Sequence, residues 1–352
     1  MSTDSHSVIS HWNNLLIVKP TSLGDVVQSL CAVTALKRTF PDRRVSFLVA
    51  DSCMQILSGH PFIDEVIEFP RTEMKKGSAG MYRAFRSIRR ELSSRQFDVV
   101  LDLQGLARSG FASYLAKAPV RIGFSDSREL SGLFYTHRIR SDRKSEHAVA
   151  RYLKAAEYLG ALPSIDVSFG LIPFPADVEK IFLRIGSGKL VGIAPGARWN
   201  TKRWPVSHFR EVAGRLVSEM GMRIVALGAP DEQELSENIV SDLPLGSAVN
   251  LCGETTLKEL VAAISLCRLF ITNDSGPMHI AAALGIPTVS IFGPTSPKRV
   301  APFGQEKYVV TSELPCLGCY MRKCDKISPN CMERVTPGSV YEMSLKAIEL
   351  AK

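Results

Sequence analysis

Short apolar runs rich in β-branched residues alternate along the chain with longer segments whose apolar residues recur every three to four positions. In the first half, strands are expected at residues 15–18, 44–49, 65–69 and 97–101, and helices at 26–39, 81–93 and 146–159. Strands and helices that alternate in this way predict an α/β fold, in which helices cover a mostly parallel sheet.

The alternation restarts in the second half, after a segment at 162–188 that contains Pro163, Pro173, Pro175 and a Gly-Ser-Gly and is expected to connect two domains. Further strands are expected at 190–194, 223–227, 248–251, 269–272 and 288–292, and a last helix at 338–351. The pattern predicts two doubly wound, Rossmann-like domains, residues 1–175 and 176–335, followed by a C-terminal helix within 336–352 whose packing stays open. In such an arrangement the carboxyl ends of both sheets face a central cleft, where ligands bind.

Composition narrows the class of protein. Of the 352 residues, 45% are hydrophobic and 22% charged, which is typical of a compact soluble protein. Apolar runs are far shorter than the roughly 18 residues of a membrane helix, and the first 14 residues are polar, unlike a secretory signal. We therefore expect a cytoplasmic protein. Its net charge of +8 favours an anionic partner: nucleic acid, a phosphorylated metabolite or an anionic membrane.

The first candidate site is the loop Lys-Pro-Thr-Ser-Leu-Gly-Asp at 19–25, which follows the first predicted strand and opens the first helix. Backbone N–H groups at a helix start bind anions, and Thr21 and Ser22 add hydroxyl groups. Asp25 has two interpretations, as a residue that caps the helix or as a general base.

Two further loops follow strands of the second domain. Residues 195–205 combine a glycine with Arg198, Lys202 and Arg203, which favours phosphate binding over a plain basic loop. Residues 272–280, Thr-Asn-Asp-Ser-Gly-Pro-Met-His-Ile, offer Asp274 and a helix start, with His279 either structural or catalytic. The dinucleotide fingerprint and the Walker sequence are absent at the strand ends, which disfavours nicotinamide chemistry and nucleotide hydrolysis.

Four of the eight cysteines, Cys316, Cys319, Cys324 and Cys331, are crowded into a short segment. Four thiolates select zinc or iron, and because they would leave no open position the role would be structural. The alternatives are a reduced surface loop or opportunistic disulfides.

The helix at 81–93 carries Arg83, Arg86, Arg89 and Arg90 beside apolar residues. It either rests on an anionic membrane surface or is an ordinary solvated basic helix. Nucleic-acid binding is disfavoured because no recognised module is present.

These motifs together resemble the bacterial lipopolysaccharide heptosyltransferases of glycosyltransferase family 9, over nearly the whole chain. The resemblance rests on the motifs at 18–25, 102–109, 121–124, 195–197, 202–205, 273–279 and 292–295. It implies a GT-B fold and metal-independent, inverting transfer without a cofactor. Heptose would move from ADP-heptose to the inner core of lipopolysaccharide, on 3-deoxy-octulosonate (Kdo) or the first heptose, at the inner face of the inner membrane.

The resemblance also assigns roles. It makes Asp25 the catalytic base and Lys202 the cation that stabilises the leaving diphosphate. It implies donor binding by Thr21, Ser22, Glu232, Asp274, Ser275, Gly276 and His279, with Asp231 and Glu234 as alternatives to Glu232. It implies acceptor binding by Arg71, Gln104, Arg108, Arg121 and Arg128. There are two alternatives: a transferase that acts on another sugar or acceptor, and a binding protein of the same family without catalytic activity. The presence of both Asp25 and Lys202 disfavours the protein without activity.

Overall fold

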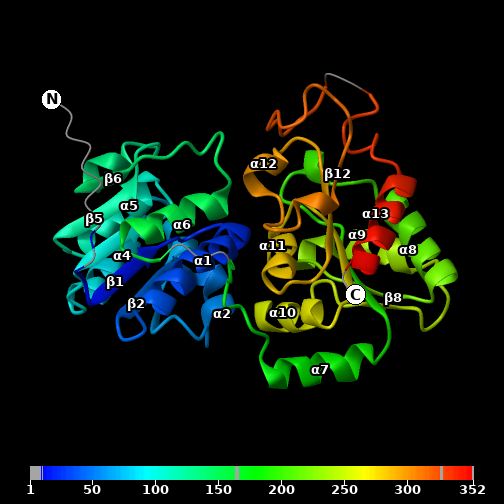
Figure 1. Ribbon diagram of the computed structural model, residues 1–352, viewed down its shortest axis with the longest axis horizontal. Helices are drawn as coiled ribbons and strands as arrows, with labels where there is room; N and C mark the ends of the chain where they lie inside the picture. Colours follow the sequence, from blue (N-terminus) through cyan, green and yellow to red (C-terminus); the bar gives the residue numbers. More distant parts are fainter. Residues whose placement is uncertain (1–8, 10, 163–165, 326–327, 351–352) are drawn as a thin grey trace. The chain divides into compact units, whose positions relative to one another are not determined.

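The computed structural model describes residues 9, 11–162, 166–325 and 328–350. The chain forms two compact units, Met1–Leu171 and Ile172–Lys352. Each contains one parallel sheet of six strands flanked by helices (Figure 1). The α/β prediction of two doubly wound sheets is therefore confirmed.

The first sheet has the strand order β3-β2-β1-β4-β5-β6. Its strands are β1 Asn14–Val18, β2 Arg44–Ala50, β3 Glu65–Phe69, β4 Val99–Asp102, β5 Val120–Phe124 and β6 His137–Ile139. The helices of this unit are α1 Leu23–Thr39, α2 Met54–Leu57, α3 Arg71–Met74, α4 Gly77–Ser93, α5 Ala107–Leu115 and α6 Ala148–Tyr158, with short 3-10 turns η1 Asp51–Cys53 and η2 Ser131–Phe134.

The second sheet has the order β12-β11-β10-β7-β8-β9. Its strands are β7 Leu190–Ala194, β8 Arg223–Ala226, β9 Ala248–Asn250, β10 Leu269–Asn273, β11 Thr288–Phe292 and β12 Val309–Thr311. The helices are α7 Pro175–Ile185, α8 Val206–Met220, α9 Gln233–Val240, α10 Leu257–Ser265, α11 Gly276–Ala283, α12 Pro297–Val300 and α13 Pro337–Leu350, with 3-10 turns η3 Asn200–Lys202, η4 Pro230–Glu232 and η5 Glu306–Tyr308.

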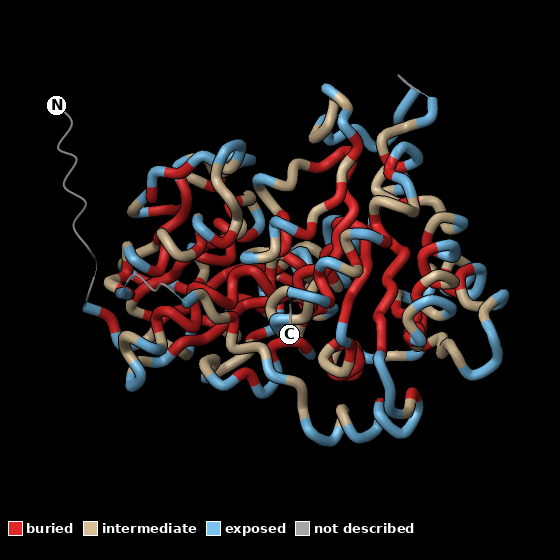
Figure 2. Tube along the Cα trace, turned by 45° about the vertical axis from the view of Figure 1, so that its right-hand side comes forward, coloured by how far each residue is buried: buried red, intermediate tan, exposed pale blue. Residues whose placement is uncertain are grey.

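Apolar side chains fill the space between each sheet and its helices, and the central strands are buried in both units (Figure 2). Trp204 anchors the second core, where its indole N–H donates to Val335 O at 2.9 Å. The last helix, α13, packs on α8, and Tyr341 donates a hydrogen bond to Glu219 across that contact. Helix α13 is thus part of the second core.

The predicted strands at 65–69, 190–194 and 288–292 are confirmed to the residue. Strands β5, β6 and β12 were not predicted. Strands β6 and β12 have only three residues each, and β5 and β6 include arginine or glycine, which break the apolar pattern. The connecting segment contains the helix α7, which the proline and glycine residues around it obscured. None of the described helices combines the length and apolar content that crossing a bilayer requires.

The two central strands of each sheet, β1 and β4 in the first and β7 and β10 in the second, are each followed by a loop. The chain order reverses between β1 and β4 in the first sheet and between β7 and β10 in the second. Doubly wound folds bind ligands outside the carboxyl ends of the strands at such a point. The loops after these four strands are therefore the expected ligand sites of the two units.

Candidate active site

The loop after β1 ends in a capped helix start. Ser22 is the N-cap of α1, and the Asp25 carboxylate accepts hydrogen bonds from the Ser22 backbone N–H at 3.0 Å and from its hydroxyl at 2.7 Å, both on Oδ2. The capping interpretation of Asp25 is therefore confirmed. The same side chain is 39% exposed, so the geometry also leaves the carboxylate open to a ligand.

A buried lysine lies beside this carboxylate. The Lys19 side chain is only 5% exposed, and its Nζ lies 3.9 Å from Asp25 Oδ1 and 3.3 Å from Leu103 O, to which it donates. Burial alone would lower the pKa of Lys19, but Asp25 and Tyr152 outweigh it and hold that pKa above its ordinary value. Lys19 therefore stays charged and fixes the loop after β1 to the loop after β4.

The loop after β4 is organised around Asp102, which is fully buried. Its carboxylate accepts hydrogen bonds from the Tyr135 hydroxyl at 2.7 Å and from the backbone N–H groups of Gln104 and Gly105 at 2.8 and 3.1 Å. Burial raises the pKa of Asp102, and these donors oppose that rise. The bonds orient Gln104, whose Oε1 accepts from Thr21 N at 3.1 Å, so the two loops meet.

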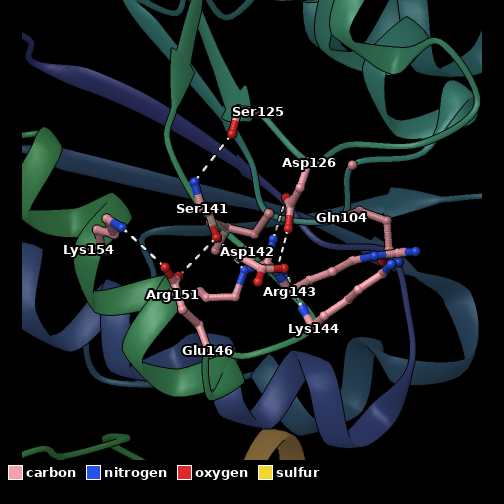
Figure 3. A network of polar contacts seen from close by, with 12 residues as sticks. Gln104, Ser125, Asp126, Ser141, Asp142, Arg143, Lys144, Glu146, Arg151 and Lys154 are labelled. Atoms are coloured by element: carbon pink, nitrogen blue, oxygen red, sulfur yellow. Dashed lines mark hydrogen bonds and ion pairs between the residues drawn. The ribbon is translucent and has the colours of Figure 1, made fainter. Parts of the chain in front are cut away.

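A third loop of this unit, between β6 and α6, is held by a polar network (Figure 3). Asp126 accepts from the Arg143 backbone N–H at 2.5 Å and from the Arg151 guanidinium at 2.7 Å. The Arg151 Nε also donates to Ser141 Oγ at 2.7 Å. In Figure 3 the side chains of Arg143 and Lys144 extend toward Gln104. Neither Arg143 nor Lys144 was predicted from the sequence as a ligand-binding residue. The run Asp142-Arg143-Lys144, polar residues shortly before a helix, was the signal that could have indicated them.

The residues assigned to the acceptor separate into two groups. Arg71 begins α3 just beyond β3, Arg108 is exposed in the first turn of α5, and Arg128 donates its backbone N–H to Gly105 O at 2.9 Å. All three, like Gln104, thus follow carboxyl ends of strands or contact a loop that does.

Arg121 lies elsewhere. It stands near the amino-terminal end of β5, paired with Val100, whereas Asp102 pairs with Gly123. Its guanidinium donates to Ala118 O at 2.7 Å and to Phe134 O at 2.8 Å. The structure therefore does not bring Arg121 together with Gln104.

In the second unit, the loops after β7 and β10 are joined by an ion pair. Lys202 Nζ lies 2.7 Å from Asp274 Oδ2, and the two side chains are 14% and 9% exposed. Asn273 reinforces this junction, because its side chain donates to Pro195 O at 2.6 Å and accepts from the Trp204 backbone N–H at 3.0 Å. Ser275 is the N-cap of α11, which follows directly, and His279 is buried in that helix.

Among the three acidic candidates after β8, the structure distinguishes Glu232. Asp231 and Glu234 are exposed, whereas Glu232 is half-buried and accepts a hydrogen bond from Ala229 N at 2.9 Å. A Cβ atom added to Gly196 would lie 1.9 Å from the Glu232 carboxylate. The glycine after β7 thus allows Glu232 to approach the loop that carries Lys202.

The cysteine segment lies against the same loop. Cys316, Cys319, Cys324 and Cys331 line one small pocket with Thr201, and the Thr201 hydroxyl donates to Met321 O at 2.9 Å. Burial, and then the neighbouring thiols, raise the pKa of Cys331. Within the described residues, which leave out 326 and 327, no group of three or more His, Cys, Asp or Glu side chains is arranged to hold a metal ion. The predicted zinc or iron site has no support from this geometry.

Comparison with known proteins gives concordant results. Residues 85–327 match the model of glycosyltransferase family 9 (heptosyltransferase). The chain is 31% identical to lipooligosaccharide heptosyltransferase 2 of Campylobacter jejuni, over 94% of this chain and 97% of that protein. It is 28% identical to lipopolysaccharide heptosyltransferase 1 of Pseudomonas aeruginosa, over 88% and 87% of the two chains. The structure of Escherichia coli heptosyltransferase WaaC with ADP is similar, with a TM-score of 0.78 and 25% identity, over 95% of this chain and 99% of that one.

Proposed function

Because the chain belongs to glycosyltransferase family 9, we propose that it transfers heptose from ADP-heptose to the inner core of lipopolysaccharide. The observation that carries this proposal is the ion pair of Lys202 and Asp274 at the carboxyl ends of neighbouring strands, beside the start of α11. A half-buried cation and the backbone N–H groups at a helix start are suited to a diphosphate. The relatives' names and the ADP in the similar structure support the same donor.

The proposed reaction is a direct displacement. Asp25 takes the proton from an acceptor hydroxyl as its oxygen attacks the anomeric carbon of the heptose. The bond from that carbon to the diphosphate breaks on the opposite face, which inverts the configuration and releases ADP. Lys202 stabilises the charge that develops on the leaving phosphate, so that no metal ion is needed for this purpose.

Most residues assigned to the donor lie in the second unit, whereas all those assigned to the acceptor lie in the first. The donor is assigned to the second unit, to Glu232, Lys202, Asp274, Ser275, Gly276 and His279, with Thr21 and Ser22 of the first unit as further ligands. The acceptor is assigned to Arg71, Gln104, Arg108, Arg128, Arg143 and Lys144. Guanidinium groups pair with carboxylates and phosphates in a bidentate manner, so this set suits an anionic inner-core sugar.

The test is a transfer assay. The purified protein is incubated with ADP-heptose and either Kdo-bearing lipid A or its mono-heptosylated form, and ADP release and acceptor mass are followed. Gain of one heptose on one of the two acceptors is expected, with inverted anomeric configuration by NMR.

Matched variants assign the roles. Asp25→Asn and Lys202→Gln should each reduce kcat at least about 100-fold, because each removes a group that acts in the transition state. Asp42→Asn and Lys189→Gln, which alter exposed residues outside these loops, should have no effect. Binding of ADP-heptose without transfer to either acceptor would contradict the acceptor assignment, and absence of binding would contradict the donor assignment.

A further inference from the structure

We propose that one surface of the first unit binds an anionic phospholipid bilayer. This surface, the docking face, consists of Tyr82, Arg86, Arg89, Tyr114, Lys117 and Leu133. The inference rests on the proposed function and extends it, because the acceptor proposed there is carried by a lipid.

The helix α4 supplies the cations of the docking face. Ala84, Ile88 and Leu92 are spaced four residues apart and buried against the unit. Tyr82, Arg86 and Arg89 are on the opposite side of the helix and are exposed. One side of α4 thus packs against the core of the first unit, and the opposite side is exposed and can contact a partner.

The charge pattern of α4 differs from that of an ordinary solvated helix. Arg83 pairs with Glu73, and Glu91, the single acidic residue of α4, lies 3.3 Å from Arg95. Within the described part of the chain, neither Arg86 nor Arg89 has an ion-pair partner. A solvated helix is typically stabilised by paired charges four residues apart, which these two arginines lack.

Exposed apolar side chains lie next to these cations. Tyr82 is 67% exposed, Tyr114 at the end of α5 is 54% exposed, and Leu133 in η2 is 76% exposed. Aromatic contacts tie the three elements together, since Phe111 packs edge to face on Phe85 of α4 at 4.8 Å and on Phe134 of η2 at 5.8 Å between ring centroids. The elements α4, α5 and η2, which carry these exposed side chains, are therefore packed against one another.

A cationic hollow connects α4 with the end of α5. Its lining consists of Arg89, Tyr114, Leu115, Lys117 and Arg121. Three cations around an open hollow suit a phosphate headgroup, and the tyrosine and leucine side chains suit the boundary between headgroups and acyl chains. This combination of cations and exposed apolar groups favours a bilayer over a nucleic acid, which would need no exposed leucine.

The experiment measures binding of the full-length protein to vesicles, without donor or acceptor. Vesicles of phosphatidylethanolamine and phosphatidylglycerol are compared with vesicles of phosphatidylcholine alone by co-sedimentation at about 0.1 M salt. The wild type should bind the anionic vesicles at least about tenfold more strongly. The double variant Arg86→Glu with Arg89→Glu should lower that binding at least about tenfold, because each cation near an anionic surface contributes about fivefold.

The control is Arg268→Glu with Lys346→Glu, which makes the same change in net charge at exposed residues of the second unit. It should retain vesicle binding within about threefold. Both double variants should transfer heptose normally to an acceptor dispersed in detergent.

Three results would refute the proposed docking face. The wild type does not bind anionic vesicles, or it binds neutral vesicles equally well, or the control Arg268→Glu with Lys346→Glu loses as much vesicle binding as Arg86→Glu with Arg89→Glu. Normal vesicle binding by a protein without transferase activity would refute the proposed function and leave the docking face standing.

Discussion

Lys19 and Asp25 lie on the same loop with 3.9 Å between Nζ and Oδ1, while Asp25 Oδ2 accepts two hydrogen bonds from Ser22. One carboxylate thus caps a helix with one oxygen and faces a buried ammonium with the other. The arrangement holds the proposed base in one orientation and keeps a positive charge next to it.

Replacement of Lys19 by methionine should move the acidic limb of the kcat/KM profile, which the proposed base Asp25 sets, to higher pH. A neighbouring cation favours the charged form of a carboxylate, and the variant loses that cation. The measurement is the pH dependence of heptose transfer. Lys37→Met is the matched control, because the half-buried Lys37 also lies beside a carboxylate, 3.0 Å from Asp64, away from these loops. An unchanged acidic limb in Lys19→Met would refute the coupling.

Replacement of Gly196 by alanine should weaken ADP binding about tenfold or more without loss of stability, because a hydrogen bond to a charged group contributes about 1.5–3 kcal/mol. The added Cβ would lie 1.9 Å from the Glu232 carboxylate, which is the mobile end of a side chain and can swing away. The fold would then persist while Glu232 leaves its place. Calorimetric titration with ADP measures the affinity, and a thermal unfolding curve measures the stability. Glu232→Gln should lose a similar amount of ADP affinity. Normal ADP binding by Gly196→Ala would argue against a donor role for Glu232.

Replacement of Gly123 by alanine should lower the free energy of unfolding by about 1–3 kcal/mol. The new Cβ would lie 2.2 Å from the ring of Tyr135, whose hydroxyl is fixed to the buried Asp102. Gly214→Ala is the control, because a Cβ there meets nothing within 4 Å and the position is inside α8. The free energy of unfolding of Gly214→Ala should be about 0.5–1 kcal/mol higher than that of the wild type. Denaturant unfolding measures both, and equal stability of the two variants would contradict the steric argument.

The pair formed by Lys180 of α7 and Glu259 of α10 should make stability sensitive to acid. The Lys180 side chain, and then the Thr256 backbone N–H, lower the pKa of Glu259 from 4.5 to about 2. A carboxyl whose pKa is lower in the folded state stabilises the fold above about pH 4.5, and this contribution disappears as the pH falls through 2.

Glu259→Gln should therefore be less stable than the wild type at pH 7, by about 1–2 kcal/mol after screening at the exposed Lys180. The difference should vanish near pH 2. Thermal unfolding of both proteins between pH 7 and about pH 2 measures this difference in stability. A difference that does not change with pH would mean that Glu259→Gln loses only the hydrogen bond to the Thr256 cap.

Local pattern determined much of this protein. The strands at 65–69, 190–194 and 288–292 were predicted to the residue, because a short apolar run, or an alternation of apolar and polar residues, indicates a strand by itself. The loops at 19–25, 195–205 and 272–280 were placed correctly at carboxyl ends of strands, since the motif directly follows the run in the sequence. The family was also evident from the order of these motifs.

Tertiary structure alone decided which side chains meet. Glu232 is distinguished from Asp231 and Glu234 because Gly196, in the loop after β7, leaves room for its carboxylate. Arg143 extends toward Gln104 because the pairing of β5 with β6 positions its loop. Arg121 belongs to a recognisable motif, yet its strand register places it away from the carboxyl ends. The approach of parallel strands that are distant in sequence depends on hydrogen bonds and packing across the whole sheet, which a single local run does not specify.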